Sequence, residues 1–252
     1  MQGFEFCCPT KIVCGAHALD KLPDEVADRG MKHPLVMTDA GLVKLGVAAK
    51  LTGVLDAADV PYEVFDQVPP DSSMDVVNEV ARLYAERGCD GFVAIGGGSV
   101  IDTTKGAAAS LACEGVDFAT LQGSEILKAD LPPFIAVPTT AGTGSETTIA
   151  AVVTGSDHHK YAISDLCLIP RYAILDPVLT VGLPPHITAE TGMDALTHAV
   201  EAYLSRFYNT KQTRLLAEHA VVAIFTHLER AYRDGTSLPD RAAMLQASFD
   251  AG

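Results

Sequence analysis

Residues 91–110 read GFVAIGGGSVIDTTKGAAAS, and this stretch decides the fold. A short apolar run ends in three glycines and continues with helical periodicity, which predicts a buried strand, a tight turn and a helix. Glycines let a ligand approach the backbone closely, and the amides at a helix N-terminus attract phosphate. We therefore expect a pyrophosphate-binding turn formed by Gly96, Gly97, Gly98 and Ser99.

A turn without a ligand is the alternative for this stretch. The common dinucleotide fingerprint needs a third glycine where this chain has Ile101, and the spacing of a P-loop is also absent. The two interpretations differ in what a side chain at Gly98 does. If the turn binds phosphate, valine at this position should abolish binding while leaving the thermal melt nearly unchanged.

A second unit of the same kind occupies residues 134–146, FIAVPTTAGTGSE. Its apolar run again predicts a buried strand, and the loop after it combines glycines with hydroxyl side chains. A plain connection does not need so many hydrogen-bonding groups, so we expect ligand contacts from Thr139, Thr140, Thr143 and Ser145. Two such loops in one chain favour a bound ligand over two empty turns.

The rest of the chain extends this pattern. Short apolar runs alternate with helical patterns until the proline-punctuated segment around residues 178–185, after which only helical periodicity remains. The sequence predicts an α/β protein with a mostly parallel-sheet, nucleotide-binding domain over residues 1–180 and an incomplete all-helical domain over residues 181–252. The other expected elements are a hairpin (4–14), strands (34–38, 62–65) and helices (16–29, 47–58, 74–87, 188–205, 211–233, 240–250).

The first helix of the second domain carries a polar pair. Its sequence is TAETGMDALTHAVEAYLS, residues 188–205, and Asp194 and His198 share one helix face because they are four residues apart. A carboxylate oxygen and an imidazole nitrogen at this spacing can bind one divalent cation, so the pair predicts half of a metal site. A solvent-exposed polar pair is the alternative.

Four motifs occur together in this chain: GGGSVIDTTKGAA, PTTAGTGSET, DPVLTVGLPP and TGMDALTHAVEAY. In this order and spacing they resemble the iron-containing (group III) alcohol dehydrogenases over the whole chain. The resemblance implies a metal-dependent oxidoreductase that transfers a hydride between a small alcohol or aldehyde and NAD(H). It also implies that Asp194 and His198 are catalytic metal ligands, for iron in preference to zinc, and that the protein is a homo-oligomer, most simply a dimer.

The resemblance adds three cofactor-binding candidates. Asp39 follows a predicted strand, where an acidic side chain can accept hydrogen bonds from a ribose and repel a 2′-phosphate; a turn aspartate that begins the next helix is the alternative. Asp102 is expected to cap the helix after the glycine turn or to hold the loop on the nicotinamide side. Lys160 is carried over as a cation beside the cofactor, against the alternative of a solvated surface lysine.

The chain departs from the family in one respect. The family's two other metal ligands are histidines from a later stretch, and this sequence stops at Gly252 before reaching one. With two protein ligands we expect weak or absent metal binding. Two alternatives remain: a relative of glycerol dehydrogenase or dehydroquinate synthase, against which His198 argues, and a nucleotide-binding fragment without catalysis.

Composition narrows the possible partners. The chain has 18 basic and 32 acidic residues and a net charge of −14, which repels nucleic acid and anionic lipid alike. Neither a secretory signal nor an apolar run long enough to cross a membrane is evident. The six cysteines lack the spacing of a metal pair and the density of a disulfide scaffold. We expect a cytoplasmic protein with reduced thiols.

Overall fold

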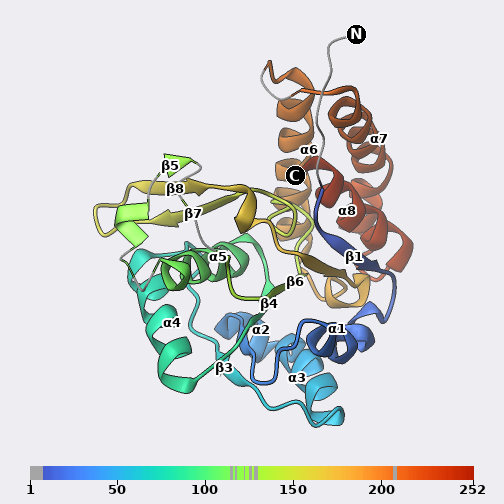
Figure 1. Cartoon of the computed structure of the whole chain (residues 1–252). Helices are drawn as coiled ribbons and strands as arrows, with labels where there is room; N and C mark the ends of the chain where they lie inside the picture. Colours follow the sequence, from blue (N-terminus) through green and yellow to red (C-terminus); the bar gives the residue numbers. More distant parts are fainter. Residues whose placement is uncertain are drawn as a thin grey trace.

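A six-stranded parallel sheet is the centre of the molecule (Figure 1). The computed structural model describes residues 8–113, 116, 118–121, 123–124, 127, 130–206 and 209–252. Every pair of neighbouring strands in the sheet is parallel. The spatial order is β1 (Lys11–Cys14), β9 (Tyr172–Leu175), β6 (Phe134–Pro138), β4 (Phe92–Gly96), β2 (Leu35–Met37) and β3 (Glu63–Phe65).

The two glycine-loop strands are the middle of this sheet. Every residue of β4 and β6 is buried, because helices cover both faces, and this burial explains why their sequences are continuous apolar runs and do not alternate. The predicted α/β class with a mostly parallel sheet is therefore confirmed. The register pairs Gly96 with Pro138, so both loops leave the sheet at the same edge.

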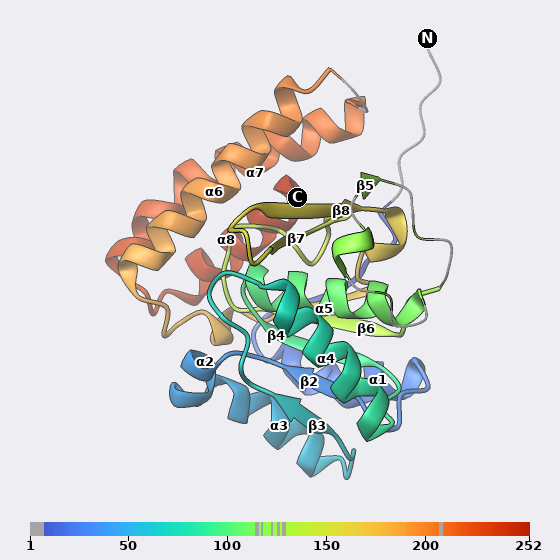
Figure 2. The same ribbon diagram turned by 90° about the vertical axis from the view of Figure 1, so that its left-hand side faces the viewer.

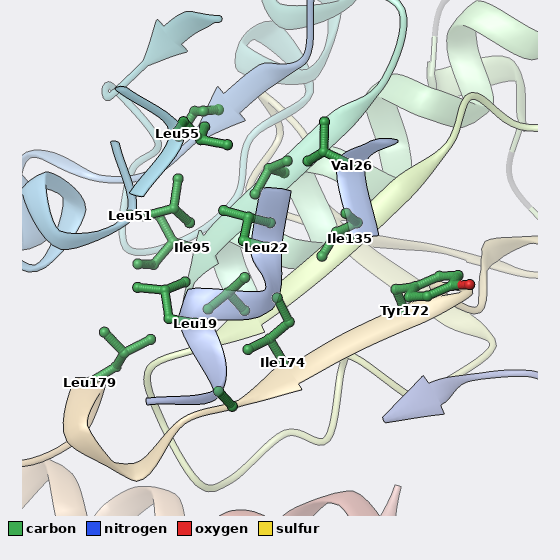
Figure 3. Close-up of a cluster of buried hydrophobic side chains, with 14 of the residues drawn as sticks. Leu19, Leu22, Val26, Leu51, Leu55, Ile95, Ile135, Tyr172, Ile174 and Leu179 are labelled. Atoms are coloured by element: carbon green, nitrogen blue, oxygen red, sulfur yellow. The ribbon is translucent and has the colours of Figure 1, made fainter. Parts of the chain in front are cut away.

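One face of the sheet is covered by α1 (Leu22–Asp28) and α3 (Val47–Ala57). Figure 3 shows their leucines meeting the isoleucines of three strands, Ile95, Ile135 and Ile174. The predicted helix at 16–29 is shorter than expected: a 3-10 turn at Ala18–Lys21 precedes α1. Pro23 has no amide hydrogen to donate, so it is tolerated in the first turn of a helix but not in its interior.

The opposite face is covered by α4 (Met74–Arg87) and α5 (Gly98–Ala112). The small residues Ala107 and Ala108 are fully buried and bring α5 close to the sheet. A second, three-stranded sheet of β5 (Gly123–Ser124), β8 (Lys160–Ser164) and β7 (Ala150–Thr154) packs on the outer side of α5. The sequence analysis did not predict this sheet, although β7 lies in the short apolar run IAAVV at residues 149–153.

The C-terminal part is helical, as predicted, and consists of α6 (Pro185–Leu204), α7 (Lys211–Arg233) and α8 (Leu238–Ala251). These helices lie together beside the parallel sheet (Figures 1 and 2). They are not separate from it, since Phe249 of α8 packs on Ala173 and Leu175 of β9. No helix in the described part of the chain is long and apolar enough to cross a membrane.

The predicted hairpin at residues 4–14 lies partly outside the described residues, which begin at Cys8. Its second half is β1, and β1 pairs in parallel with β9, about 160 residues later in the chain. Sequence periodicity identifies such a strand, but the partner is set by the packing of the whole sheet.

Candidate functional site

The side on which successive strands are added to the sheet changes between β2 and β4. The strand after β2 in the sequence, β3, lies on one side of β2, whereas β6 and β9 follow on the far side of β4. From β2 the chain passes through α2 (Ala40–Lys44) and α3 on one face, whereas from β4 it passes into α5 on the other face. The two loops therefore separate at the carboxyl edge of the sheet and leave a crevice, which is where α/β sheets of this kind bind ligands. A cleft of about 850 Å³ occupies this position.

The cleft brings together most of the predicted cofactor-binding residues. Loops after four strands, β2, β3, β4 and β6, contribute to it, together with α5, α6, β7 and β8. The predicted residues that line it are Asp39, Gly97, Gly98, Ser99, Asp102, Thr139, Thr140, Thr143 and Lys160. Gly96 and Ser145 do not line it: Gly96 is the buried last residue of β4, and Ser145 is buried behind the loop.

Hydrogen bonds within α5 and to Pro70 fix the conformation of the glycine turn. Gly97 is the N-terminal cap of α5, and its carbonyl accepts the first helical hydrogen bond, from the Val100 amide at 3.1 Å. The amides of Gly98 and Ser99 precede that bond and have no partner inside the helix. The Ser99 hydroxyl donates to the Pro70 carbonyl, so the backbone amide of Ser99, and not its hydroxyl, is available to a ligand.

The second loop is packed tightly against the first. A β-carbon on Gly98 would lie 2.7 Å from Cγ2 of Thr143, and one on Gly97 would lie 3.2 Å from Oγ1 of Thr140. The Thr139 amide donates to the Gly96 carbonyl at 3.0 Å and continues the pairing of the strands. A side chain at Gly98 would require Thr143 to shift, and one at Gly97 would be a tight contact with Thr140.

Asp102 is hydrogen-bonded to two residues of the segment that follows the second glycine loop. Its Oδ1 accepts a hydrogen bond from the Ser145 hydroxyl, and its Oδ2 accepts one from the Val152 amide at 3.0 Å. Burial raises the pKa of Asp102, while the nearby Lys105 ammonium and these hydrogen bonds lower it. The hydroxyl of Ser145, another predicted cofactor-binding residue, is therefore hydrogen-bonded to Asp102.

Two buried ionisable residues beside the cleft escaped the sequence analysis, Lys105 and Glu146. Lys105 is fully buried, and burial lowers its pKa to about 8 against the opposing effect of Asp102 and Glu146. Burial also raises the pKa of Glu146 to about 7. Within the described residues Oε1 of Glu146 is buried without a hydrogen-bond partner. Lys105 could have been suspected, because it lies one turn after Asp102 on the same helix face.

Asp39 and Lys160 lie on the rim of the cleft. Asp39 caps α2, since its Oδ1 accepts the Leu42 amide at 2.9 Å, as expected for an aspartate that begins a helix. It also lines the cleft, so the helix-cap position and a ribose contact through its other oxygen are compatible. Lys160 begins β8 and is exposed.

The pair predicted to bind metal, Asp194 and His198, lies on α6, whose N-terminal half lines the cleft. Ile187 and Thr191 of this helix line the cleft, and Asp194 and His198 continue the same helix face. His198 Nε2 lies 3.7 Å from Asp194 Oδ1, and both side chains are partly exposed. Two atoms at this distance can both reach one cation at about 2.1 Å. In the described ranges no group of three or more histidine, cysteine or acidic side chains could hold a metal ion.

A parallel sheet with a glycine turn at its switch point is the architecture of doubly wound nucleotide-binding proteins. Residues 9–177 match the family model described as iron-containing alcohol dehydrogenase, and residues 188–252 match that of the Fe-containing alcohol dehydrogenase family, C-terminal. The chain belongs to the iron-containing alcohol dehydrogenase family, as its motifs indicated.

Individual relatives agree with this assignment. The chain is 38% identical to choline dehydrogenase of Bacillus subtilis (strain 168) in an alignment of 256 positions that covers 100% of this chain and 63% of that protein. It superposes on the alcohol dehydrogenase from Oenococcus oeni with a TM-score of 0.94 at 36% identity, covering 99% of this chain and 66% of the other. Sulfoacetaldehyde reductase from Bifidobacterium kashiwanohense, solved in complex with NAD+, gives a TM-score of 0.90 at 31% identity, covering 100% and 66%. The chain thus spans less than two thirds of the length of these proteins.

Proposed function

We propose that this chain binds NAD(H) in the cleft at the carboxyl edge of the sheet and acts in hydride transfer between a small alcohol or aldehyde and that cofactor. The observation that carries the proposal is the convergence of two glycine loops, Asp39 and Lys160 on one cleft at the switch point. Membership of a family of alcohol dehydrogenases and the likeness to a reductase solved with NAD+ support it.

The order of the strands suggests how the dinucleotide lies. Asp39 follows β2, the glycine turn follows β4 and Thr139 follows β6, and these three strands are adjacent in this order. Asp39 would then accept the ribose of the adenosine, and the amides of Gly98 and Ser99 would bind the pyrophosphate. The nicotinamide half would lie beyond them, between Thr140 and α6.

A second hollow extends the cleft on the side of Asp39. It has a volume of about 600 Å³ and shares residues such as Leu42, Leu45 and Leu183 with the cleft. Its walls are mostly apolar and would suit a flat base, with Val178 and Leu179 among them. We assign the adenine to this hollow.

The residues for a metal are partly present. Asp194 and His198 have the donor atoms and spacing for one divalent ion, iron in preference to zinc, and would hold it beside the nicotinamide half. When bound, the nicotinamide supplies hydride transfer and the ion supplies polarisation of the substrate oxygen. The apolar side chains of Ile187 and Val152 would limit water at that end of the cleft.

A nucleotide-binding module without catalysis is the second candidate. The observation that favours it is that the described residues contribute two metal donors and no third to any one place. Turnover separates the two candidates, whereas cofactor binding is common to both.

We also propose a domain boundary at residues 180–181, a cytoplasmic location and a homo-oligomer, most simply a dimer. Among the cysteines that the structure describes, all five have free thiols, which suits a reducing compartment. Light scattering on the purified protein would measure the oligomeric state.

The experiment that tests the function has two steps. Titration calorimetry with NAD+ and NADP+ measures binding, and absorbance at 340 nm then follows the oxidation of small primary alcohols with added Fe2+ or Zn2+. We expect binding of NAD+ in preference to NADP+, and turnover that depends on metal. If neither cofactor binds, the proposal is wrong; if NAD+ binds without any turnover, the module without catalysis is the better description.

A further inference from the structure

Asp102 and Lys105 form a pair of opposite charges on one face of α5, beneath the wall of the cleft. They lie three residues apart, so they project from adjacent turns toward the same neighbouring segment, Ser145–Val152. Lys105 is completely buried, which is unusual for a lysine and costs free energy unless its ammonium is hydrogen-bonded.

The Lys105 ammonium is fully satisfied. Its Nζ donates to the Thr148 carbonyl at 2.8 Å, to the Thr148 hydroxyl at 3.0 Å and to the Ala150 carbonyl at 2.9 Å. An ammonium has three hydrogens, so each of them has a partner. Two of the acceptors belong to Thr148, just before β7, and the third to Ala150, the first residue of β7.

Asp102 binds the same segment at its two ends. Its carboxylate accepts from the Ser145 hydroxyl and from the Val152 amide. Together the two charged side chains contact four residues of the segment: Ser145, Thr148, Ala150 and Val152. Because charge-assisted hydrogen bonds are stronger and more directional than neutral ones, this clamp fixes the segment relative to α5.

The clamped segment forms one wall of the cleft. Thr143, just before it, Val152, at its end, and Thr154, two residues beyond, all line the cleft. The two clamp residues belong to α5, whose N-terminus presents the amides of Gly98 and Ser99 to the cleft. The clamp therefore sets the width of the cleft beyond the pyrophosphate position, on the side where the nicotinamide half is assigned.

We propose that Lys105 is a positioning residue for the nicotinamide half of the cofactor, acting through Thr148 and Ala150 on the wall that ends at Val152. This inference rests on the proposed function. Lys105 does not touch the cleft itself, so its effect is on geometry. Replacing it by an apolar side chain removes the Lys105 hydrogen bonds to both carbonyls, leaves Ala150 with only the long bond from the Thr148 hydroxyl among the side-chain donors, and frees the segment to move.

The test compares two ligands that differ in the nicotinamide half. ADP occupies only the adenosine and pyrophosphate positions, whereas NAD+ also needs the clamped wall. Lys105→Met keeps the length of the side chain and removes the ammonium. The control is Leu51→Ala, which destabilises the opposite face of the sheet by creating a cavity and leaves the clamp intact. Titration calorimetry well below the melting temperatures of all three proteins gives the dissociation constants.

We expect Lys105→Met to weaken NAD+ binding by about tenfold or more and ADP binding by less than about threefold. Leu51→Ala should leave both dissociation constants unchanged. The inference is overturned if Lys105→Met binds NAD+ normally, or if it loses NAD+ and ADP to the same degree. If the unaltered chain binds ADP and not NAD+, or neither, the proposed function fails and this inference fails with it.

A milder variant covers the case in which Lys105→Met does not fold. Thr148→Ala removes one of the three acceptors and leaves the ammonium bound to both carbonyls. It should weaken NAD+ binding by roughly threefold with ADP binding unchanged. Equal affinities for NAD+ in this variant and in the unaltered chain would count against the clamp.

Discussion

Gly98 has two expected functions: it lets the two glycine loops pack together, and it leaves room for the pyrophosphate at the start of α5. The variant Gly98→Ala tests both. In Gly98→Ala the new β-carbon lies 2.7 Å from Cγ2 and 3.0 Å from Oγ1 of Thr143, distances that require the Thr143 side chain or its loop to shift. The same methyl group stands beside the amides at the start of α5, where we assign the pyrophosphate. The variant should therefore lose both stability and cofactor affinity.

The two losses have different sizes and causes. Overpacking of this kind costs roughly 1–3 kcal/mol of unfolding free energy. Loss of a hydrogen bond to a charged group costs roughly 1.5–3 kcal/mol, which is about 10- to 100-fold in the dissociation constant of NAD+. The expectation from sequence alone, an unchanged melt for a valine at this position, ignored the contact with Thr143 and is corrected here.

A second substitution distinguishes the two effects. Thr143→Ser removes Cγ2, the atom in closest contact, and keeps Oγ1, which accepts the Ser145 amide at 3.2 Å. In the double variant with Gly98→Ala most of the lost stability should return, while NAD+ binding stays weak because the methyl group still stands at the helix start. Urea unfolding and titration calorimetry measure the two quantities.

The matched control is Gly53→Ala, in the middle of α3. A β-carbon there meets no described atom within 4 Å, so alanine should stabilise the helix by up to about 1 kcal/mol and leave NAD+ affinity unchanged. The reasoning about Gly98 is refuted if Gly98→Ala binds NAD+ as tightly as the unaltered chain, or if the double variant regains full affinity.

Three further experiments, with four substitutions, test the remaining parts of the site. Asp39→Asn keeps an acceptor for the Leu42 amide and removes the charge. The difference in binding free energy between NAD+ and NADP+ should therefore narrow by about 1 kcal/mol, with little loss of stability. If calorimetry finds the same difference before and after the change, Asp39 does not contact the ribose. Because burial raises the pKa of Glu146 from 4.5 to about 7, the native protein binds more protons than the unfolded chain between these values, and its stability falls as pH rises through this window. Glu146→Gln should abolish this decline in unfolding free energy, which is worth a few kcal/mol, in urea melts recorded from pH 4.5 to 7. If the unfolding free energy of both proteins has the same dependence on pH, the pKa of Glu146 is not raised. Asp194→Ala and His198→Ala should each reduce the amount of Zn2+ that the protein retains after equilibrium dialysis, without changing its affinity for NAD+. Elemental analysis measures the retained Zn2+. If either variant retains as much Zn2+ as the unaltered chain, the metal binds elsewhere.

The sequence predicted secondary structure best where a segment's own residue pattern reflects how it is buried. The strands at residues 92–96 and 134–138 are buried on both faces, so their apolar runs are unbroken and easily recognised. The three C-terminal helices have strong helical periodicity, and their bounds differ from the prediction by at most a few residues. The family motifs then pointed to the iron-containing alcohol dehydrogenases, which the family match confirms.

Contacts between distant segments were not predictable in the same way. The hydrogen bonds of Lys105 reach acceptors more than forty residues away, and Ser145 binds Asp102 across a similar separation. In the sequence Ser145 is one hydroxyl among several in a glycine-rich loop. Only the packing of the second sheet on α5 shows that it is buried behind the cleft.

The amino-acid sequence by itself determined the alternating elements, the two glycine turns and the Asp194–His198 pair, because each depends on residues within about one helix or strand length of one another. The tertiary structure alone decided which strands are neighbours, that β1 pairs with β9, and that Asp102, Lys105 and Glu146 share one buried region. Buried charges take their partners and their pKa values from whatever packs around them. That environment comes from segments far apart in the chain and exists only once they have folded together.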